Sequence, residues 1–451
     1  MKIAATFAAA LMASVIALPA GEPDVRELLK PVPPVSVAEN GGALMAKLET
    51  VCSRREMHGY DFGYKDPDYL VDPDSLDAFM EEQSELVKVT REIIARKEFH
   101  ITSEKLPDGM QCLTKACTAI RLQSLLSVKK GKWGAATSDL IRLSRFHRRM
   151  MESAESTSLV MMSVGSVWQD AAIIPQLIRQ TSNQKRIRPL AAGYEPLAIH
   201  NDVFGGAIRA EMHSLLESFE TARSGGEPLK KLLAGLQLVD ETGVEWNKAF
   251  KKVKDGDPEP VKGIVDTLTN WEERVLEVLK DPPAAMQAQL QEIAKIDWQE
   301  HDRNFLRYAK ATLETDRSTW ARSQETAPQP QSFFSGILLK QAQAEFEVRQ
   351  FWSKHFYKAA AISRLAKVSL ALCVWQLDHG GTLPDRLEQL VPQCLSAIPV
   401  DPFDGKPVRY QKAGQRLWCV GVDLNDDIGQ LKNLKDRAKD DDVMIEAGKP
   451  H

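Results

Sequence analysis

Several patterns by which function is commonly recognised are missing from this sequence. It contains no Gly-x-x-x-x-Gly-Lys-Ser/Thr, Gly-x-Gly-x-x-Gly, His-Glu-x-x-His or Gly-x-Ser-x-Gly motif. The commonest nucleotide-binding, zinc-protease and serine-hydrolase patterns are therefore absent. The nine histidines are scattered, and no two lie three to five residues apart, so a histidine metal site is not expected. A Ser-x-x-Lys sequence at 182–185 lies in a polar stretch without its partner motifs, and we interpret it as a chance match.

Cysteine is also scarce, with six residues in a chain of 451 and no Cys-x-x-Cys pair. This excludes a fold built on disulfides, and it argues against a zinc ribbon or a thioredoxin-like motif. Cys112 and Cys117 fall within one helical pattern, on different faces and about 8 Å apart, which is too far for a bridge. We therefore interpret most of the cysteines as buried free thiols.

Neither charge nor a long apolar run dominates the chain after its first residues. Its 58 basic and 62 acidic residues leave a net charge of −4, which gives no general attraction to nucleic acid. Residues 1–20 carry Lys2 followed by an almost wholly apolar run, with Leu18-Pro19-Ala20 as a cleavage sequence and Val15-Ile16-Ala17 as the alternative. This pattern predicts a signal peptide and export to the bacterial periplasm or cell envelope. We expect membrane attachment only if this leader is retained, because no later run is predicted to be long and apolar enough to form a second span.

The remaining sequence predicts a mainly α-helical protein, a bundle or solenoid, with a small α+β domain at its C-terminus. Proline and glycine suggest a tether at 21–39, a helical domain at 40–323, a linker at 324–332 and a C-terminal domain at 333–451. Apolar periodicity predicts a helical array over 110–179. Further helices are expected at 44–54, 76–97, 204–222, 229–253, 261–279, 286–322 and 333–379, and strands at 408–410, 417–420 and 443–445.

Residues 115–150 have an unusual excess of positive charge. Nine lysines and arginines oppose a single acid, Asp139. Arg142, Arg145 and Arg149 share one helix face at i, i+3 and i+7. One interpretation is a surface for an anionic partner outside the cytoplasm. The alternative is a solvated face that is partly neutralised by acids of the helix expected at 76–97, namely Glu81, Glu82 and Glu85.

The C-terminal segment contains the most specific pattern in the chain. The expected long helix ends at Gly380-Gly381, followed by Thr-Leu-Pro-Asp-Arg-Leu at 382–387 and Pro-Val-Asp-Pro-Phe-Asp-Gly-Lys-Pro-Val-Arg-Tyr at 399–410. This segment resembles the globular domain of type II secretion major pseudopilins. The whole chain resembles exported bacterial proteins that join a helical domain to such a C-terminus. It departs from pseudopilins at the N-terminus, which lacks their short basic leader, Gly-Phe processing site and glutamate.

The resemblance to pseudopilins also implies a calcium site. In that family one aspartate after the final strand and a later acidic pair supply oxygen ligands, and Asp423, Asp441 and Asp442 match these positions. An EF-hand in this region is excluded, because Ile428 stands where its glycine is required and Leu434 where its glutamate is required. Neighbouring lysines offer the alternative of simple charge neutralisation, namely Lys432, Lys435 and Lys439.

We therefore expect an exported, non-enzymatic binding or scaffold protein of the bacterial cell envelope. Its partner would be another envelope protein and not nucleic acid. Two alternatives stay open at this point. One is an envelope hydrolase with its site in a cleft of the helical bundle, since sixty-two carboxylates could include a catalytic pair that no motif reveals. The other is an accessory component of a secretion system.

Overall fold

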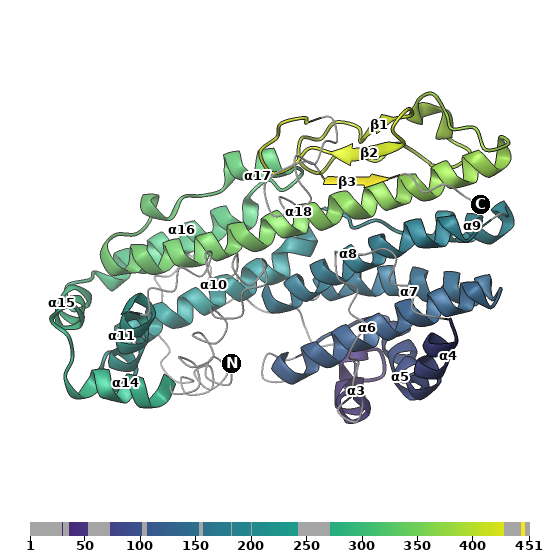
Figure 1. Cartoon of the computed structure of the whole chain (residues 1–451). Helices are drawn as coiled ribbons and strands as arrows, with labels where there is room; N and C mark the ends of the chain where they lie inside the picture. The colour runs from purple at the N-terminus through teal and green to yellow at the C-terminus, as the bar shows by residue number, and fades with distance from the viewer. Residues whose placement is uncertain are drawn as a thin grey trace. The chain divides into compact units, whose positions relative to one another are not determined.

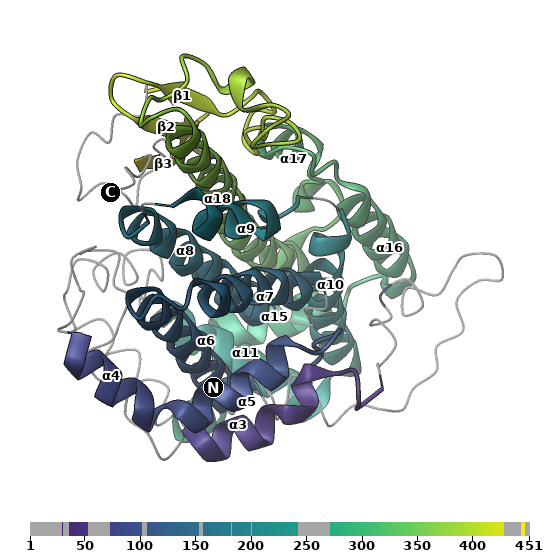
Figure 2. The ribbon, with the colours of Figure 1, turned by 90° about the vertical axis from the view of Figure 1, so that its right-hand side faces the viewer.

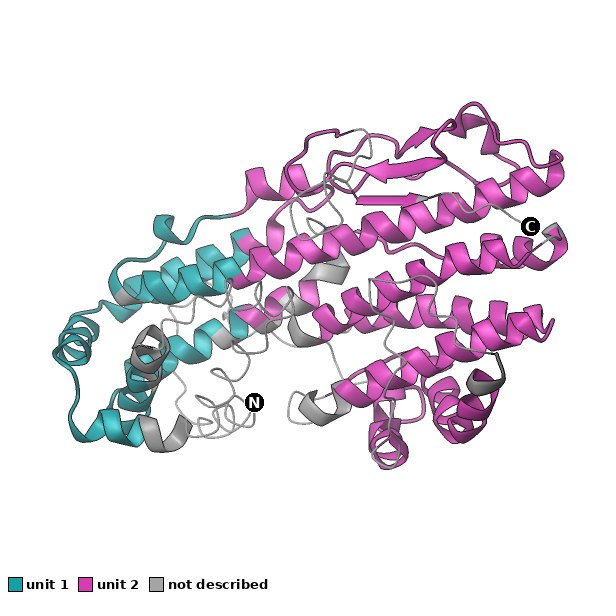
Figure 3. Cartoon of the chain, viewed as in Figure 1, with its two compact units in different colours: residues 1–28, 212–311, 328–347 teal, residues 29–211, 312–327, 348–451 magenta. Residues whose placement is uncertain are grey.

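The computed structural model confirms a mainly helical chain with a small three-stranded sheet (Figure 1). It describes residues 29, 36–52, 73–101, 106–152, 157–181, 183–199, 201–241, 271–427 and 443–446. Residues 1–20, the expected signal peptide, lie outside this part of the chain. The described residues cluster into two compact units, one comprising 212–311 and 328–347 and the other comprising 29–211, 312–327 and 348–451 (Figure 3).

The larger unit is built on antiparallel helices that follow one another in the chain. Helix α6 packs against α7, α7 against α8, and α7 also against α9. Gly131, in the left-handed region with φ of 74°, makes the tight turn between α6 and α7. These helices are α6 (Leu106–Lys129), α7 (Trp133–Glu152), α8 (Thr157–Arg179) and α9 (Gln184–Gly193).

Three shorter helices cover α6 on its other side. Helices α3, α4 and α5 all pack against α6, and their bounds are α3 (Met45–Cys52), α4 (Pro73–Glu82) and α5 (Ser84–Ile94). The sequence predicted one helix over 76–97, but the structure breaks it at the buried Gln83. Residues at the end of the expected tether are attached to this layer, because the Glu98 N–H donates to the Glu39 carbonyl over 3.1 Å and Lys97 pairs with the Glu39 carboxylate at 2.8 Å.

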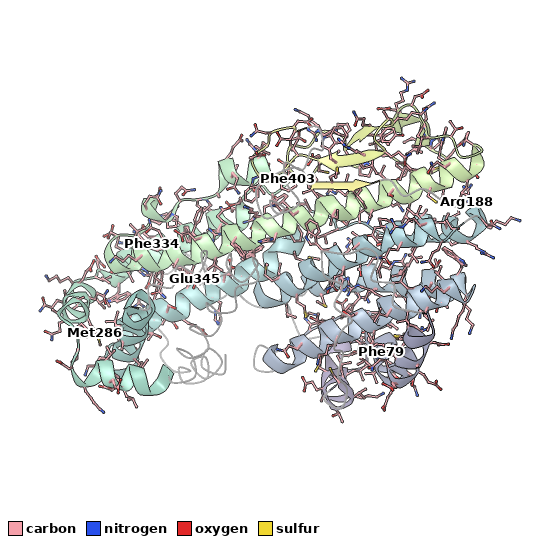
Figure 4. All side chains as sticks on the ribbon, viewed as in Figure 1. Phe79, Arg188, Met286, Phe334, Glu345 and Phe403 are labelled. Carbon is pink, nitrogen blue, oxygen red and sulfur yellow. The ribbon has the colours of Figure 1, made fainter. Side chains whose placement is uncertain are left out.

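The C-terminal part of the larger unit is a small sheet against a long helix. Helix α18 (Gly336–Asp378) ends at Gly380 and Gly381, both with positive φ, and the sheet lies along it (Figures 1 and 2). The strands β1 (Arg409–Gln411), β2 (Arg416–Cys419) and β3 (Val443–Glu446) are antiparallel in the order β1-β2-β3. Phe403 faces α18 (Figure 4) and its ring lies 6.3 Å from that of Tyr357.

Helix α18 also corrects an expectation about membrane spans. Residues 338–378 of this helix are long and apolar enough to cross a membrane by length and composition, although 78% of the most apolar window is buried inside the protein. Charged residues are spaced along 338–378, which makes this apolar run hard to recognise from the sequence. The buried side chains include Phe356, Leu365 and Leu372, so the apolar character is accounted for by packing.

The smaller unit consists of helical segments around an aromatic core. The rings of Phe219 and His301 lie 4.5 Å apart, and those of Phe219 and Phe305 lie 5.7 Å apart. The unit contains α11 (Gly226–Glu241), α14 (Trp271–Lys280), α15 (Ala284–Ile293), and residues from α10 (Asn201–Ser224), α16 (Trp298–Glu314) and α18. One helix expected at 286–322 is therefore three, namely α15, α16 and α17 (Trp320–Thr326).

The compact units differ from the domain division expected from the sequence. The sequence separated 40–323 from 333–451, whereas residues 29–211 and 348–451 belong to one unit. The physical reason is direct bonding: Lys367 of α18 donates to the Tyr194 carbonyl at 2.9 Å, and the Ser363 hydroxyl accepts from the Leu197 N–H at 2.9 Å. The expected linker is also structured, since 324–326 end α17 and the buried Pro330 begins a short 3-10 helix.

Candidate functional site

The three arginines expected to form one cationic face have different environments. Arg142 is exposed. Arg145 pairs with Glu195 at 2.9 Å, and Arg149 is half-buried and donates to the Ile94 carbonyl at 2.6 Å. They therefore do not form a single open surface, which corrects the interpretation drawn from helical spacing alone.

The basic region also makes ion pairs that its sequence did not predict. Asp139 is buried and pairs with Arg91 of α5 at 2.6 Å. Asp77 of α4 pairs with Lys130 at 2.5 Å. Asp77 and Glu195, which pairs with Arg145, are thus acids outside the set Glu81, Glu82 and Glu85 that meet the basic helices, whereas Asp139 neutralises Arg91 of α5.

A buried polar cluster joins the first three helices of the array. Arg121 of α6 donates to Asp170 of α8 at 2.7 Å and to the Ser166 carbonyl at 2.9 Å. His147 Nδ1 of α7 lies 2.7 Å from the other oxygen of Asp170. Arg121 and His147 are fully buried and Asp170 is 4% exposed. Such a cluster fixes the relative positions of three helices, and because all three side chains are buried it is not open to a substrate.

Electrostatics within this cluster favour the ionised carboxylate. Burial acts to raise the pKa of Asp170, but the Arg121 guanidinium and His147 outweigh it and hold this pKa below its ordinary value. The same environment disfavours other anions. Burial, with a contribution from Asp170, raises the pKa of the Tyr194 phenol far above its usual value. Burial likewise raises the pKa of the Cys117 thiol to about 12, so neither group is available as a nucleophile at neutral pH.

A group of exposed positive charges lies at one end of the array. Because α6 to α9 alternate in direction, the turn between α6 and α7 and the turn between α8 and α9 lie at the same end, which faces the viewer in Figure 2. We call the exposed cations at these turns the basic end: Lys129, Lys132, Arg179, Lys185 and Arg186. Two neighbouring cations are paired, Lys130 with Asp77 and Arg188 with Asp378 at 2.6 Å.

Helix electrostatics account for only two of these five cations. Lys129 and Arg179 lie in the last turns of α6 and α8, where a cation stabilises the helix dipole. Lys132 immediately precedes α7, and Lys185 and Arg186 lie in the first turn of α9, where a cation opposes the dipole. The sequence pattern alone marks 182–185 only as part of a polar stretch. A signal was available, because basic residues at a helix start break the usual capping pattern.

The predicted calcium ligands are only partly described. Asp423 is exposed, and its carboxylate accepts from the Asn425 N–H and the Asn425 side-chain amide, both at 3.1 Å. Asp441 and Asp442 lie outside the described residues. Among the described residues no three His, Cys, Asp or Glu side chains are grouped to hold a metal ion. Two of the predicted ligands lie outside those residues, so the calcium site stays a prediction.

A second buried network organises the C-terminal turn that resembles pseudopilins. Asp401 accepts from the backbone N–H groups of Phe403 at 2.8 Å and Val420 at 2.7 Å. Arg409 contacts Asp401 and donates to Asp404 at 2.6 Å. Burial raises the pKa of Asp401 to about 6, although the two N–H groups and Arg409 act to lower it. The sequence indicated the resemblance of this segment to pseudopilins but not its bond to Val420, which directly follows β2.

No protein-family model matches the chain, and no curated protein or solved structure was found to match it. The resemblance to pseudopilins thus depends on the residues of 380–423. Within that segment the helix end at Gly380-Gly381 and the strands β1 and β2 follow the expected order.

Proposed function

We propose that this protein is an exported, non-enzymatic binding protein of the bacterial cell envelope, and that its helical array binds an acidic partner protein through the basic end. The observation that carries this proposal is the placement of Lys132, Lys185 and Arg186 at helix starts, where each opposes the helix dipole. Charges that cost stability and share one exposed end are suited to a binding role. Complementary charge on a partner would increase its association rate and fix its orientation.

The chemistry of the buried groups supports binding over catalysis. Arg121, His147 and Asp170 form the best-connected titratable cluster of the array, and all three are buried. Their geometry is explained by helix packing. An envelope hydrolase would need such groups at the wall of a cleft, and no observation on this cluster favours that alternative.

In this proposal the C-terminal segment is a pseudopilin-like module that stabilises the larger unit. Two observations support that role. The network around Asp401 holds the turn at 401–405 against β2, and Arg364 of α18 donates to the Val400 carbonyl at 2.7 Å. The module would thus act as a rigid part of the scaffold rather than as a polymerising subunit.

Binding by the basic end is testable with poly-glutamate as an acidic probe in a fluorescence anisotropy titration. We expect binding that weakens as salt screens the charges. Charge reversal at the basic end should reduce the affinity about tenfold or more. The reversed residues are Lys129→Glu, Lys132→Glu, Lys185→Glu and Arg186→Glu. Three of the new glutamates lie at helix starts, where they favour the dipole, so this variant should remain folded.

A matched control reverses four exposed cations of the smaller unit, namely Lys295, Arg303, Arg307 and Lys340. It changes the net charge equally and should retain most of the affinity. An equal loss in both variants would show that net charge alone determines binding and would refute the basic end. Stronger binding to anionic phospholipid vesicles than to poly-glutamate would contradict a protein partner.

Export is tested separately by sequencing the N-terminus of the native protein after cell fractionation. We expect a mature chain beginning near Leu18 or Gly21 outside the cytoplasmic membrane. An intact Met1 in the cytoplasmic fraction would refute export but would leave the binding measurements unaffected.

A further inference from the structure

An open pocket lies where α18 ends beside the turn that joins β1 to β2. Its volume is about 780 Å³, and it is lined by residues from the end of the helix, from the segment that follows and from the turn. Pockets of this volume commonly hold small ligands, so a few residues of a peptide would fit. The lining residues include Gln376, Thr382, Leu383, Lys412, Ala413 and Gln415.

Gln376 gives this pocket an unused hydrogen-bonding group. The residue is 5% exposed, and among the residues that the structure describes its side-chain oxygen has no hydrogen-bond partner. A buried polar group without a partner costs stability. Because the terminal torsion of a glutamine is broad, the carboxamide can turn toward a ligand in the pocket. A ligand N–H would then supply the missing bond.

The walls of the pocket are held in place by contacts within the larger unit. The Gly381 N–H donates to the Gln376 carbonyl at 2.7 Å and closes the end of α18. The Tyr410 hydroxyl donates to the Pro384 carbonyl at 3.1 Å, which connects β1 to the segment after the helix. The pocket therefore exists before a ligand binds, and binding avoids the cost of ordering its walls.

The charges around the pocket favour an acidic ligand. Lys412 lines the pocket and pairs with the exposed Asp385 at 2.6 Å. The end of α18 also lies against the start of α9, because its last residue, Asp378, pairs with Arg188 at 2.6 Å (Figure 4). The same helix α9 carries two cations of the basic end in its first turn. The pocket therefore adjoins the basic end.

From these observations we propose that the pocket at the end of α18 binds a short acidic peptide segment of the partner protein, whose remaining acids contact the basic end. The Gln376 carboxamide bonds to the peptide backbone, which offers a donor and an acceptor at each residue. Lys412 pairs with a carboxylate of the segment. The acidity of this segment rests on the proposed function, whereas recognition of its backbone depends on Gln376.

Two polyanions separate the pocket from the basic end. Poly-glutamate and polyacrylate both carry carboxylates, but only poly-glutamate has a peptide backbone. Labelled samples of each are titrated with the purified full-length protein at one salt concentration and followed by fluorescence anisotropy. Gln376→Met should weaken the binding of poly-glutamate about fivefold and leave that of polyacrylate unchanged. Because this change removes an unpaired buried group, the melting temperature should stay the same or rise.

The role of Lys412 is tested with variants of opposite expected effect. Lys412→Gln should weaken the binding of poly-glutamate about threefold more than Lys406→Gln. The second variant is a matched control, because it removes an equal charge from a lysine of the same module that pairs with Asp404 at 3.7 Å. Asp385→Asn removes the acid that competes for Lys412 and should strengthen the binding about twofold.

A second variant of the pocket protects the test against a folding defect. Ala413 is exposed, so Ala413→Trp should fold normally, fill the pocket and weaken poly-glutamate as Gln376→Met does. Unchanged affinity for poly-glutamate in both variants, or an equal loss for both polyanions, would overturn the pocket. The basic end would remain supported if its charge reversal still weakened binding. A wild-type protein that binds neither polyanion would refute both proposals.

Discussion

The Arg121 guanidinium is a positive charge buried inside the helical array, and neighbouring polar groups stabilise it there. The guanidinium reaches the Asp170 carboxylate, the Gln169 side chain and the Ser166 carbonyl. His147 completes the contacts of Asp170 at 2.7 Å. A buried charge pair of this kind gains little over apolar packing, but removal of one partner leaves the other charge uncompensated. Asp170 is thus more important to stability than an exposed acid would be.

Replacing Asp170 by asparagine should therefore lower the free energy of unfolding by about 3 kcal/mol. The isosteric change preserves shape and removes only the charge that neutralises Arg121. Urea denaturation followed by circular dichroism measures the difference. The control is Arg145→Gln, which breaks the exposed pair with Glu195 and should cost no more than about 1 kcal/mol. Similar losses in both variants would contradict the role assigned to the buried pair.

The stability difference between the wild type and Asp170→Asn should also depend on pH. The pKa of Asp170 is lowered in the folded protein by Arg121 and His147, against the effect of burial. Its contribution to stability is therefore complete above the unfolded pKa of about 3.9 and is lost as the pH falls through the lower folded pKa. The stability difference between wild type and Asp170→Asn should be constant near pH 6 and shrink below about pH 4. A difference that grows on acidification would contradict this sign.

Two glycines provide a matched test of local packing. A Cβ on Gly42 would lie 1.9 Å from the backbone oxygen of His100, whereas a Cβ on Gly134 of α7 would have no heavy atom within 4 Å. Gly42→Ala should thus destabilise the protein by about 2 kcal/mol or more, because backbone must move. Gly134→Ala should stabilise it by about 0.5–1 kcal/mol through helix propensity. Thermal melts of both variants test the pair, and equal effects would contradict the packing of 40–42 on 98–101.

At the scale of the elements, strong periodicity and glycine turns were enough to predict much of the fold. The end of α18 at Gly380 was predicted because glycine is favoured just past the end of a helix, where it takes a positive φ. The breaks within 286–322 were missed because polar caps, not glycine or proline, make them. Asp297 accepts from the backbone of Gln299 at 3.0 Å and starts α16. Thr319 likewise accepts from Arg322 and starts α17.

The candidate site was predicted less well, because it depends on contacts between distant residues. Composition revealed the excess of basic residues in 115–150. It did not reveal that Asp139 would pair with Arg91, or that Arg149 would donate to a carbonyl of α5. Those partners are 48 and 55 residues away in the sequence. Helical spacing fixes which residues share a face, whereas tertiary packing determines which face remains exposed.

The loop between β2 and β3 carries the prediction of calcium binding. Asp423 follows β2, and its carboxylate is exposed to solvent. Calorimetric titration of the full-length protein should show heat and a raised melting temperature at millimolar calcium, since hard carboxylate oxygens suit this ion. The combined Asp441→Ala and Asp442→Ala variant should lose both effects. Asp385→Ala, at an exposed acid that pairs with Lys412 and is not a predicted ligand, should retain them. Equal calcium responses in all three proteins would refute the site.

At the scale of the whole molecule, the larger unit is assembled from three separate stretches of chain. Its two long stretches are joined by hydrogen bonds from α18 to the segment after α9 and by the ion pair of Arg188 with Asp378. Trp352 adds a hydrogen bond to Glu211, and both residues are buried. These contacts are internal to one compact unit. The C-terminal module should therefore require the N-terminal helices for its own stability.

This dependence predicts the behaviour of a chain cut at the edge of that unit. Inserting a protease recognition site between Ala327 and Pro328, where the chain passes from one compact unit to the other, allows a clean cut of the folded protein. The fragments 1–327 and 328–451 should elute together in size-exclusion chromatography, because the buried interface between α18 and 29–211 remains intact after the chain is cut. Adding Lys367→Ala, which removes the bond to the Tyr194 carbonyl, should promote dissociation. Lys406→Ala, at an exposed position, is the control. A fragment 328–451 that elutes alone and melts cooperatively would instead support the division at 324–332 that proline and glutamine suggest in the sequence.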